Sequence, residues 1–428
     1  MSGIALAMIA MSGRVTMLGI SRWTGAGGSY RTVQRFFATV VPWASLFWLF
    51  FRTHLYRQAE VYLLAGDEVV VTKAGKATHG LDRFFASLYG KAVPGLAFFA
   101  LSLVSVQARH AFPMAIEQIM RSETEKAASK AKAIAKAQPP AGAKRPAGRP
   151  KGGKNKNKTA VPLTPELLRI QGLVNALWQR IAGWLPLTYL LLDGHFGHNN
   201  ALQMTRQSNL HLISKLRNDS ALYFPDASAY GGRGPRRKYG VKVDYRNLPD
   251  QYRQATHLDG SLQTCCYQAT LLHKQFSQPL NVVIVVKTNL DTRTVAHVVL
   301  FSSDLTLSYD KLFDYYCLRF QIEFNFRDAK QFWGLEDFMN ISPIAVTNAA
   351  NLALFMVNLS YRLLLDFRCT RPAFSVLDLK AFARGYRYVD ETIKLLPQKP
   401  DPVLLTQIFN RITALGQIHP NHPGPEPT

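Results

Sequence analysis

Runs of apolar residues predict a mixed α/β protein in the first half of the chain. Five short runs, rich in aliphatic residues, have the length and composition of strands. They lie at residues 61–73, 93–106, 112–119, 187–194 and 209–217. Between the third and fourth runs a helix is predicted to begin at Thr164, an N-cap, with Pro165 in its first turn. A short helix is predicted between the fourth and fifth runs, so strands and helices alternate there.

The second half of the chain begins β-rich and ends helical. Strand-like runs occur throughout residues 218–305, around a glycine-rich basic loop, "YGGRGPRRKYG" (230–240). Residues 315–338 contain no proline, and their one glycine is Gly334, so a long helix is predicted there. A second helical pattern covers 345–368, and the proline-rich end of the chain predicts disorder.

These patterns divide the chain into eight predicted segments. They are a helical N-terminal region (1–58), the first part of a core (59–120), a disordered basic insert (121–160), the second part of the core (161–217), a β-rich insertion (218–306), a helix (307–340), C-terminal helices (341–415) and a disordered tail (416–428). The N-terminal region has two helical patterns separated by "GAGG". These patterns fit a DNA-binding helix-turn-helix and, nearly as well, a small packing domain.

The basic insert differs in composition from the rest of the chain. It holds 12 Lys and Arg against 2 Glu, a balance of +10 out of a net charge of +23 for the whole chain. It has no aromatic residue and one branched aliphatic, Ile134, so it lacks the apolar surface needed to offset its ordering entropy. Its stretch "KRPAGRPKGGK" (144–154) resembles a minor-groove AT-hook, but Ala147 stands where the first arginine belongs. The composition favours a solvated basic loop that contacts phosphates without sequence preference.

Charge and cysteine content bound the partners and the compartment. A net charge of +23 and an isoelectric point near 9.9 favour a polyanionic partner, either nucleic acid or an anionic membrane surface. The four cysteines have no zinc-type spacing and indicate a reducing cytoplasm without disulfides. The apolar run 92–106 is shorter than the ~20 residues of a spanning helix and contains Pro and Gly, so no membrane segment is predicted.

Three carboxylates interrupt apolar elements, namely Asp67, Asp193 and Glu323. A buried carboxylate is costly unless it is paired or binds a metal. Asp67 also fits a hairpin turn, and Asp193 also fits the end of a strand before a Gly turn. The stretch "DGHFGHNN" adds His195 and His198, so a zinc site is a further alternative there.

The predicted helix at 315–338 carries charge on one face. At about 100° per residue, Tyr316, Arg319, Glu323 and Lys330 fall within an arc of roughly 60°. The simplest interpretation is a solvent-exposed face on which Arg319 and Glu323 form an i,i+4 pair. The alternative is that a phenol, a carboxylate and two cations act together in a site.

The order of predicted elements favours the second interpretation. Three strands, a helix, a strand, a short helix and a strand occur in the order of an RNase H-like core. In that fold the first and fourth strands lie side by side, and a late helix packs across them. Three carboxylates would then converge from distant parts of the chain and hold two Mg²⁺ ions, which prefer oxygen ligands and support in-line phosphoryl displacement.

The chain resembles the DDE transposases of bacterial insertion sequences, in the branch with the pattern Y-x(2)-R-x(3)-E-x(6)-K. All four positions match, at Tyr316, Arg319, Glu323 and Lys330. The stretches "FQIEFNFRDAKQFWGLEDF", "YLLLDG" and "GDEVVVTKAGK" are also similar to that family. The resemblance covers about residues 60–365 apart from the basic insert.

This resemblance implies a site and its cofactors. Asp67, Asp193 and Glu323 would be the catalytic acids and would hold two Mg²⁺ ions, for which Mn²⁺ would substitute. The acid at Asp67 has a second acid, Glu68, beside it. The residues expected to contact DNA phosphates are Tyr316, Arg319 and Lys330 on the helix and Arg233, Arg236, Arg237 and Lys238 in the basic loop.

The resemblance also implies partners and a reaction. The enzyme would bind the inverted-repeat ends of its element as double-stranded DNA, cut them and join the freed 3′-OH to target DNA, as a homodimer in a synaptic complex and without a membrane. Two other functions stay open. One is a basic DNA-binding protein with an inactive transposase core, and the other is a metal-dependent nuclease that cuts without joining.

Overall fold

The computed structural model describes residues 1–25, 28–86, 89–127, 131, 157–229, 232, 234 and 236–419. Arg233 and most of the predicted insert and tail lie outside the described residues. The described ends of both segments make specific contacts. Glu125 pairs with Arg169 at 3.2 Å, and the His419 N–H donates to Asp378 at 3.1 Å. These described ends thus contact groups far away in sequence, and the prediction for the rest of both segments falls on residues outside the described ones.

In the described part of the chain, twelve strands form one mixed sheet. They are β1 (Tyr62–Thr72), β2 (Asp82–Ala86), β3 (Lys91–Ser105), β4 (His110–Gln118), β5 (Tyr189–Leu191), β6 (His211–Leu216), β7 (Leu222–Pro225), β8 (Tyr239–Lys242), β9 (Arg253–Asp259), β10 (Leu262–His273), β11 (Leu280–Asn289) and β12 (Val295–Ser302). Their spatial order is β2-β3-β1-β5-β6-β12-β11-β10-β7-β8, with β4 beside β3 and β9 beside β10.

The five strands predicted from the first half of the chain form one end of this sheet. They are β1, β3, β4, β5 and β6, and the fourth of them, β5, pairs in parallel with the first, β1, as predicted. Helix α6 (Pro165–Ile181) begins as predicted, with the Thr164 hydroxyl accepting from the Leu167 N–H at 3.3 Å. The short helix α7 (Asn199–Gln207) follows β5. This arrangement is compatible with an RNase H-like core.

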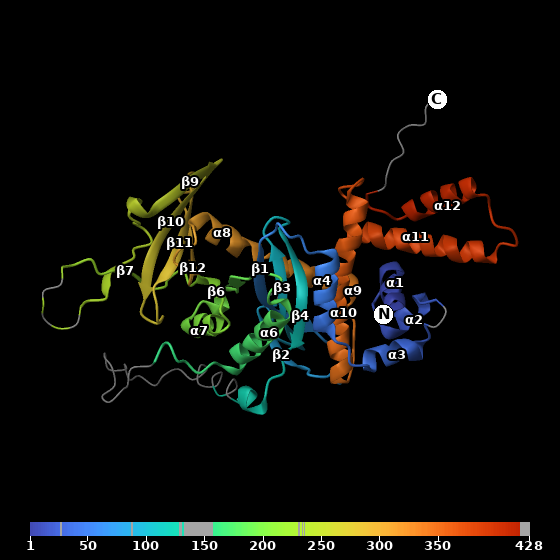
Figure 1. The fold of residues 1–428 in the computed structure, drawn as a ribbon, viewed down its shortest axis with the longest axis horizontal. Coiled ribbons are helices and arrows are strands. Elements are labelled where there is room, and N and C mark those ends of the chain that lie inside the picture. Colours follow the sequence, from blue (N-terminus) through green and yellow to red (C-terminus); the bar gives the residue numbers. More distant parts are fainter. Residues whose placement is uncertain are drawn as a thin grey trace, which may run out of the picture.

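The strands of the β-rich insertion continue the same sheet. β12 pairs antiparallel with β6, and β11, β10, β7 and β8 follow it outward (Figure 1). The described part of the basic loop, including Arg236, Arg237 and Lys238, leads into β8 at the far end of the sheet. The insertion is therefore an extension of the core rather than a detached module.

The single helix predicted at 315–338 is two helices, and that prediction was wrong. α8 (Tyr309–Leu318) and α9 (Gln321–Trp333) meet at Arg319 and Phe320. Around this junction the backbone bonds span three residues, as in Arg319 N–H to Tyr316 O at 3.2 Å. α8 packs against β6, β10, β11 and β12, whereas α9 packs against β1, β4 and α10. The two helices thus follow different parts of a twisted sheet.

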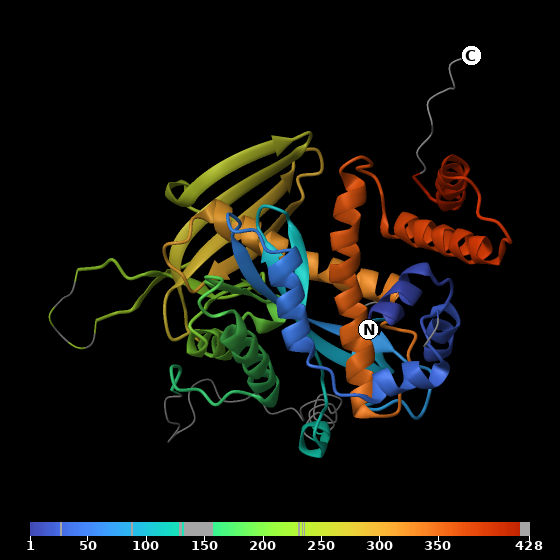
Figure 2. The same ribbon diagram turned by 45° about the vertical axis from the view of Figure 1, so that its right-hand side comes forward.

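Helices from both ends of the chain cover the core together. They are α1 (Ser2–Ala10), α2 (Met17–Trp23), α3 (Tyr30–Ala38), α4 (Trp43–His54), α10 (Pro343–Arg368), α11 (Val376–Leu395) and α12 (Pro402–Ala414). The Trp43 Nε1–H donates to Asn348 Oδ1 at 2.7 Å, and the Phe47 and Phe355 rings lie 5.7 Å apart. Figure 2 shows α10 running between the sheet and helices α1 to α3, whereas α4 lies on the sheet side and packs against β4. The N-terminal region is thus packed into the core, whatever it binds.

Helix α10 is the one described helix that is long and apolar enough to span a membrane, and α3 and α4 pass the same measure as a pair bent by 100°. In α10, 78% of the apolar window is buried inside the protein. Its apolar surface is accounted for by the core.

The contact between α1 and α11 predicts a pH dependence of stability. Lys380 donates to the Met8 carbonyl at the end of α1, and burial, with Arg384 nearby, lowers its pKa from 10.5 to about 8. Between these two pKa values the unfolded chain binds more protons than the folded protein, so the free energy of unfolding should rise with pH from about 8. Lys380→Met should flatten part of this rise, measured by urea unfolding between pH about 8 and 9.5.

A matched control is Lys242→Met, which removes an exposed lysine from β8. Burial also lowers the pKa of Lys73 to about 8. Because Lys73 is present in both variants, part of the rise of the unfolding free energy with pH remains in each. Equal slopes for wild type and Lys380→Met would show that α1 does not bury this ammonium group.

Candidate active site

The pairing of β1 with β5 brings two of the predicted acids together. In this parallel pair, Ala65 lies opposite Leu191. Asp67 and Asp193 each follow two residues later, so both acids continue the same face of adjacent strands. The carboxyl ends of parallel strands are a common place for ligand sites. The sheet register alone therefore places these two carboxylates side by side.

The third acid reaches Asp67 through Arg319. Arg319 Nη1 lies 2.8 Å from Asp67 Oδ2, and its Nη2 lies 2.8 Å from Glu323 Oε1. The Arg319 side chain is only 12% exposed, compared with 18% for Asp67 and 40% for Glu323. The predicted i,i+4 pair is thus present, but it does not lie on a solvent-exposed face. The guanidinium joins acids from β1 and α9.

The electrostatics of Asp67 reflect this crowding. Burial raises the pKa of Asp67 to about 6, although the Arg319 charge and the Glu68 N–H act in the opposite direction. The negative charges of Asp193 and Glu323 contribute to the raised pKa. Since the charges of Asp193 and Glu323 act on Asp67, a bound divalent cation would relieve a repulsion built into the site.

Asp193 also has a local structural role. Its carboxylate accepts from the His195 N–H at 3.1 Å and caps the short 3₁₀ helix Gly194–Phe196. The two histidines considered for zinc have other partners. His195 Nε2 lies 3.4 Å from Glu166 Oε1, and His198 Nδ1 accepts from the Ala201 N–H at 3.3 Å.

The two remaining residues of the four-residue pattern have different surroundings. Tyr316 lies in α8, packs against the apolar cluster beneath that helix, and has a pKa raised by burial. Lys330 Nζ donates to the Val70 carbonyl of β1 at 2.9 Å and lies 3.0 Å from Glu336 Oε1. Lys330 therefore ties α9 to β1 and takes no part in the Arg319 network.

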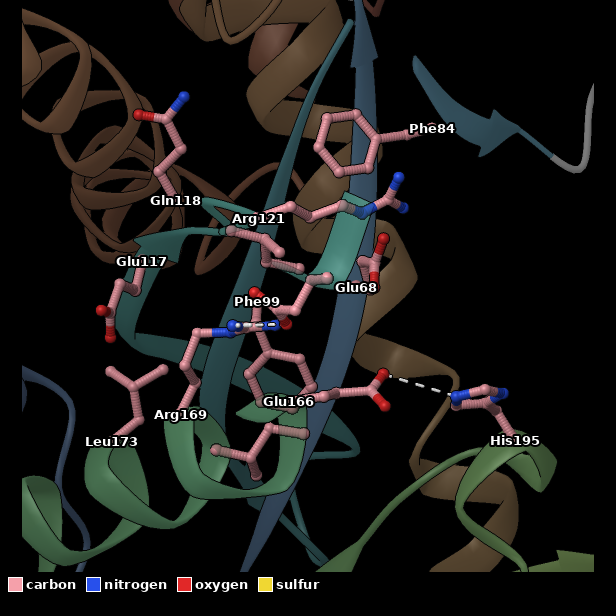
Figure 3. A pocket seen from close by; sticks show the side chains of 13 residues that line it. Glu68, Phe84, Phe99, Glu117, Gln118, Arg121, Glu166, Arg169, Leu173 and His195 are labelled. Carbon is pink, nitrogen blue, oxygen red and sulfur yellow. Dashed lines mark hydrogen bonds and ion pairs between the residues drawn. The ribbon is translucent and has the colours of Figure 1, made fainter. Parts of the chain in front are cut away.

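Glu68 lies on the other side of β1 from Asp67 and lines a cavity of about 290 Å³. Figure 3 shows Glu166 of α6 pointing toward His195 at one side of this cavity. Apolar walls come from Phe84 and Phe99. The resemblance named Asp67 as the acid, with Glu68 beside it, and the structure brings Asp67, not Glu68, to Arg319. No sequence signal indicated the cavity, because its walls come from six separate segments.

The donor set fits divalent cations. Asp67, Asp193 and Glu323 offer carboxylate oxygens only, which suit hard ions such as Mg²⁺ better than zinc. Among the residues that the structure describes, no group of three or more His, Cys, Asp and Glu side chains lies close enough to hold an ion as arranged. Arg319 stands between Asp67 and Glu323 in this arrangement.

The basic loop lies apart from these acids. Arg236, Arg237 and Lys238 are exposed and precede β8, which is separated from β1 by six strands of the sheet. The structure does not bring them together with the acids, and Arg233 lies outside the described residues.

Comparison with known proteins gives one family. A family model described as DDE superfamily endonuclease matches residues 1–278, more than half of the chain. The matched range includes Asp67 and Asp193 and ends before Glu323. Among curated proteins, none matches the chain significantly.

Proposed function

Since the chain belongs to the DDE superfamily endonucleases, an enzyme family with nuclease- or transposase-type activity, we propose that it is a DNA transposase of an insertion sequence. It binds the inverted-repeat ends of its element, cleaves them and joins the freed 3′-OH to target DNA. The observation that carries this proposal is the convergence of Asp67 and Asp193 on paired parallel strands, with Glu323 linked to Asp67 through Arg319.

Each acid would have a defined role in catalysis. Asp67 presents its carboxylate from β1, Asp193 presents its own from just beyond the end of the adjacent β5, and Glu323 adds a third from the first turn of α9. Two Mg²⁺ ions held there, or Mn²⁺ in their place, would supply Lewis-acid activation of the attacking oxygen and stabilise the leaving oxygen. Arg319 and Lys330 hold the acids in register and, with Tyr316, border the place where a DNA strand would lie.

The charge of the chain fits this partner. The net charge is +23, and the region 132–156 alone carries eight Lys and Arg and no Asp or Glu. Contacts of such residues with phosphates supply affinity without sequence preference. We place the enzyme in the bacterial cytoplasm, associated with the nucleoid when it is bound to DNA, and acting as a homodimer on two element ends.

Two alternatives differ in what happens to the DNA. A nuclease would cut and release ends by hydrolysis, and a protein with an inactive core would bind without cutting. All three acids are present, and Asp193 and Glu323 both lie close enough to Asp67 for their charges to act on it, which favours an active enzyme.

A strand-transfer assay separates these functions. The substrate is a duplex that carries the short inverted repeat flanking the gene, already cut to expose its 3′-OH, mixed with a supercoiled target plasmid and Mg²⁺. We expect covalent joining of the labelled strand to the plasmid. Cleavage of the uncut duplex without joining would indicate a nuclease, and binding without either product would indicate an inactive core.

A further inference from the structure

Arg319 occupies an unusual position for a residue that would only contact DNA. Both of its terminal nitrogens bind carboxylates, those of Asp67 and Glu323, each at 2.8 Å. The two acids come from β1 and α9, which are far apart in sequence, and both belong to the proposed metal-binding set. A buried guanidinium between two carboxylates neutralises the charge that a divalent cation would otherwise neutralise.

The guanidinium and a metal ion therefore need the same oxygens. Asp67 Oδ1 accepts from the Glu68 N–H at 2.8 Å, and its Oδ2 accepts from Arg319. An ion binding to both Asp67 and Glu323 would meet the positive charge of Arg319 at contact distance, where repulsion is strong and poorly screened.

The arrangement is also incompletely satisfied. Arg319 Nε is buried and has no hydrogen-bond partner in the described structure. A buried donor without a partner costs free energy, so the side chain is held in this position less strongly than a fully hydrogen-bonded one would be. The Arg319 backbone lies at the junction of α8 and α9, where the helical bonding is irregular, so the side chain starts from the least regular position of the two helices.

We propose that Arg319 is a displaceable counter-ion, which holds Asp67 and Glu323 in place before the divalent ions bind and leaves at least one of them when the ions arrive. The inference rests on the proposed function, because it assumes that these acids bind metal. Arg319 is thus a positioning residue whose pairing competes directly with metal binding. This pairing lowers the affinity of the acids for metal, and it stabilises the site while no ion is bound.

The test is Mn²⁺ binding by the full chain, measured by isothermal titration calorimetry in the absence of DNA. Arg319→Gln should bind Mn²⁺ at least about tenfold more tightly than wild type, because the competing cation is gone. Arg319→Lys should fall between the two, since it keeps the charge but has no fork to bind both acids. The melting temperature without metal should fall for Arg319→Gln, and the rise on adding Mn²⁺ should exceed that of wild type.

Arg327→Gln is the matched control. Arg327 lies on α9, is 59% exposed and forms its ion pair with its neighbour Asp328, so its replacement removes the same charge without touching the acids. Its Mn²⁺ affinity should stay within about twofold of wild type. Equal or weaker Mn²⁺ binding by Arg319→Gln, with wild-type binding present, would overturn the counter-ion role alone. Absence of Mn²⁺ binding by all the proteins would overturn the proposed function as well.

Discussion

Replacing Asp193 by Asn should lower Mg²⁺-dependent DNA cleavage by more than about 100-fold, equivalent to about 2.7 kcal/mol of transition-state stabilisation. The carboxylate lies beside Asp67 on the paired strand, and a neutral amide is a weaker ligand for a hard cation. The fold should persist, because the amide oxygen of Asn can still accept the His195 N–H that Asp193 accepts at 3.1 Å. DNA binding should stay nearly unchanged, since the contact surface keeps its cations.

Cleavage is measured on an end-labelled duplex that carries the element end, and DNA affinity on the same duplex by fluorescence anisotropy. The matched control is Asp291→Asn, which makes the same chemical change in the exposed turn between β11 and β12. It should cleave at the wild-type rate. Full Mg²⁺-dependent cleavage by the Asp193 variant would remove this residue from the catalytic set.

The elements that the sequence predicts best are those with strong local signals. The start of the helix at Thr164 and Pro165 depends on hydrogen bonds between near neighbours in the sequence, and the structure confirms it. The short apolar run that ends at Asp193 is too hydrophobic to lie anywhere but inside the sheet. From the order of such runs, the pairing of β1 with β5 could be inferred, and with it the proximity of Asp67 to Asp193.

Contacts between segments that are distant in the sequence could not be predicted from the pattern of residues. The spacing of Arg319 and Glu323 predicts their pair, but nothing local indicates that Arg319 also binds Asp67, 252 positions away. The break between α8 and α9 is similar. It occurs without proline or glycine, so tertiary packing on a twisted sheet, not helix propensity, decides it.

The same limit applies to the N-terminal region. Its helical periodicity and glycine-rich break fit a free DNA-binding unit and, nearly as well, a packed region. The contacts that decide its placement come from α10 and α11, more than 300 residues later, as in the bond from Trp43 to Asn348. Its packing limits which of its surfaces remain to meet DNA.

Lys330 gives the last test, because the structure offers it a role other than phosphate binding. Its ammonium group donates to the Val70 carbonyl at 2.9 Å and so fixes α9 against β1. Glu323 lies two helical turns earlier on α9, and Asp67 lies three residues before Val70 on β1. Lys330 thus fixes the relative position of the two elements that carry these acids.

Lys330→Ala should therefore fold and lose more than about tenfold in cleavage, the effect of about 1.4 kcal/mol, because a small displacement of Glu323 misplaces the reacting groups. The loss of folding free energy should be modest, since a partly exposed ion pair contributes about 0–1 kcal/mol. Cleavage, melting temperature and the salt dependence of DNA binding are measured together. If Lys330 contacts a phosphate, the slope of log binding constant against log salt concentration should be smaller by about 1 in the variant. If Lys330 only positions α9, this slope should be the same as in wild type.

Glu336→Gln is the control that separates the two contacts of Lys330. It removes the ion pair at 3.0 Å and leaves the bond to the Val70 carbonyl in place. If that bond positions α9, the Glu336 variant should cleave at nearly the wild-type rate while the Lys330 variant does not. Wild-type cleavage by both variants would mean that α9 holds its place through its apolar contacts alone, since Ile322, Phe326 and Trp333 are buried against the core. The role of the helix in the reaction would then be confined to Glu323 and its partner Arg319.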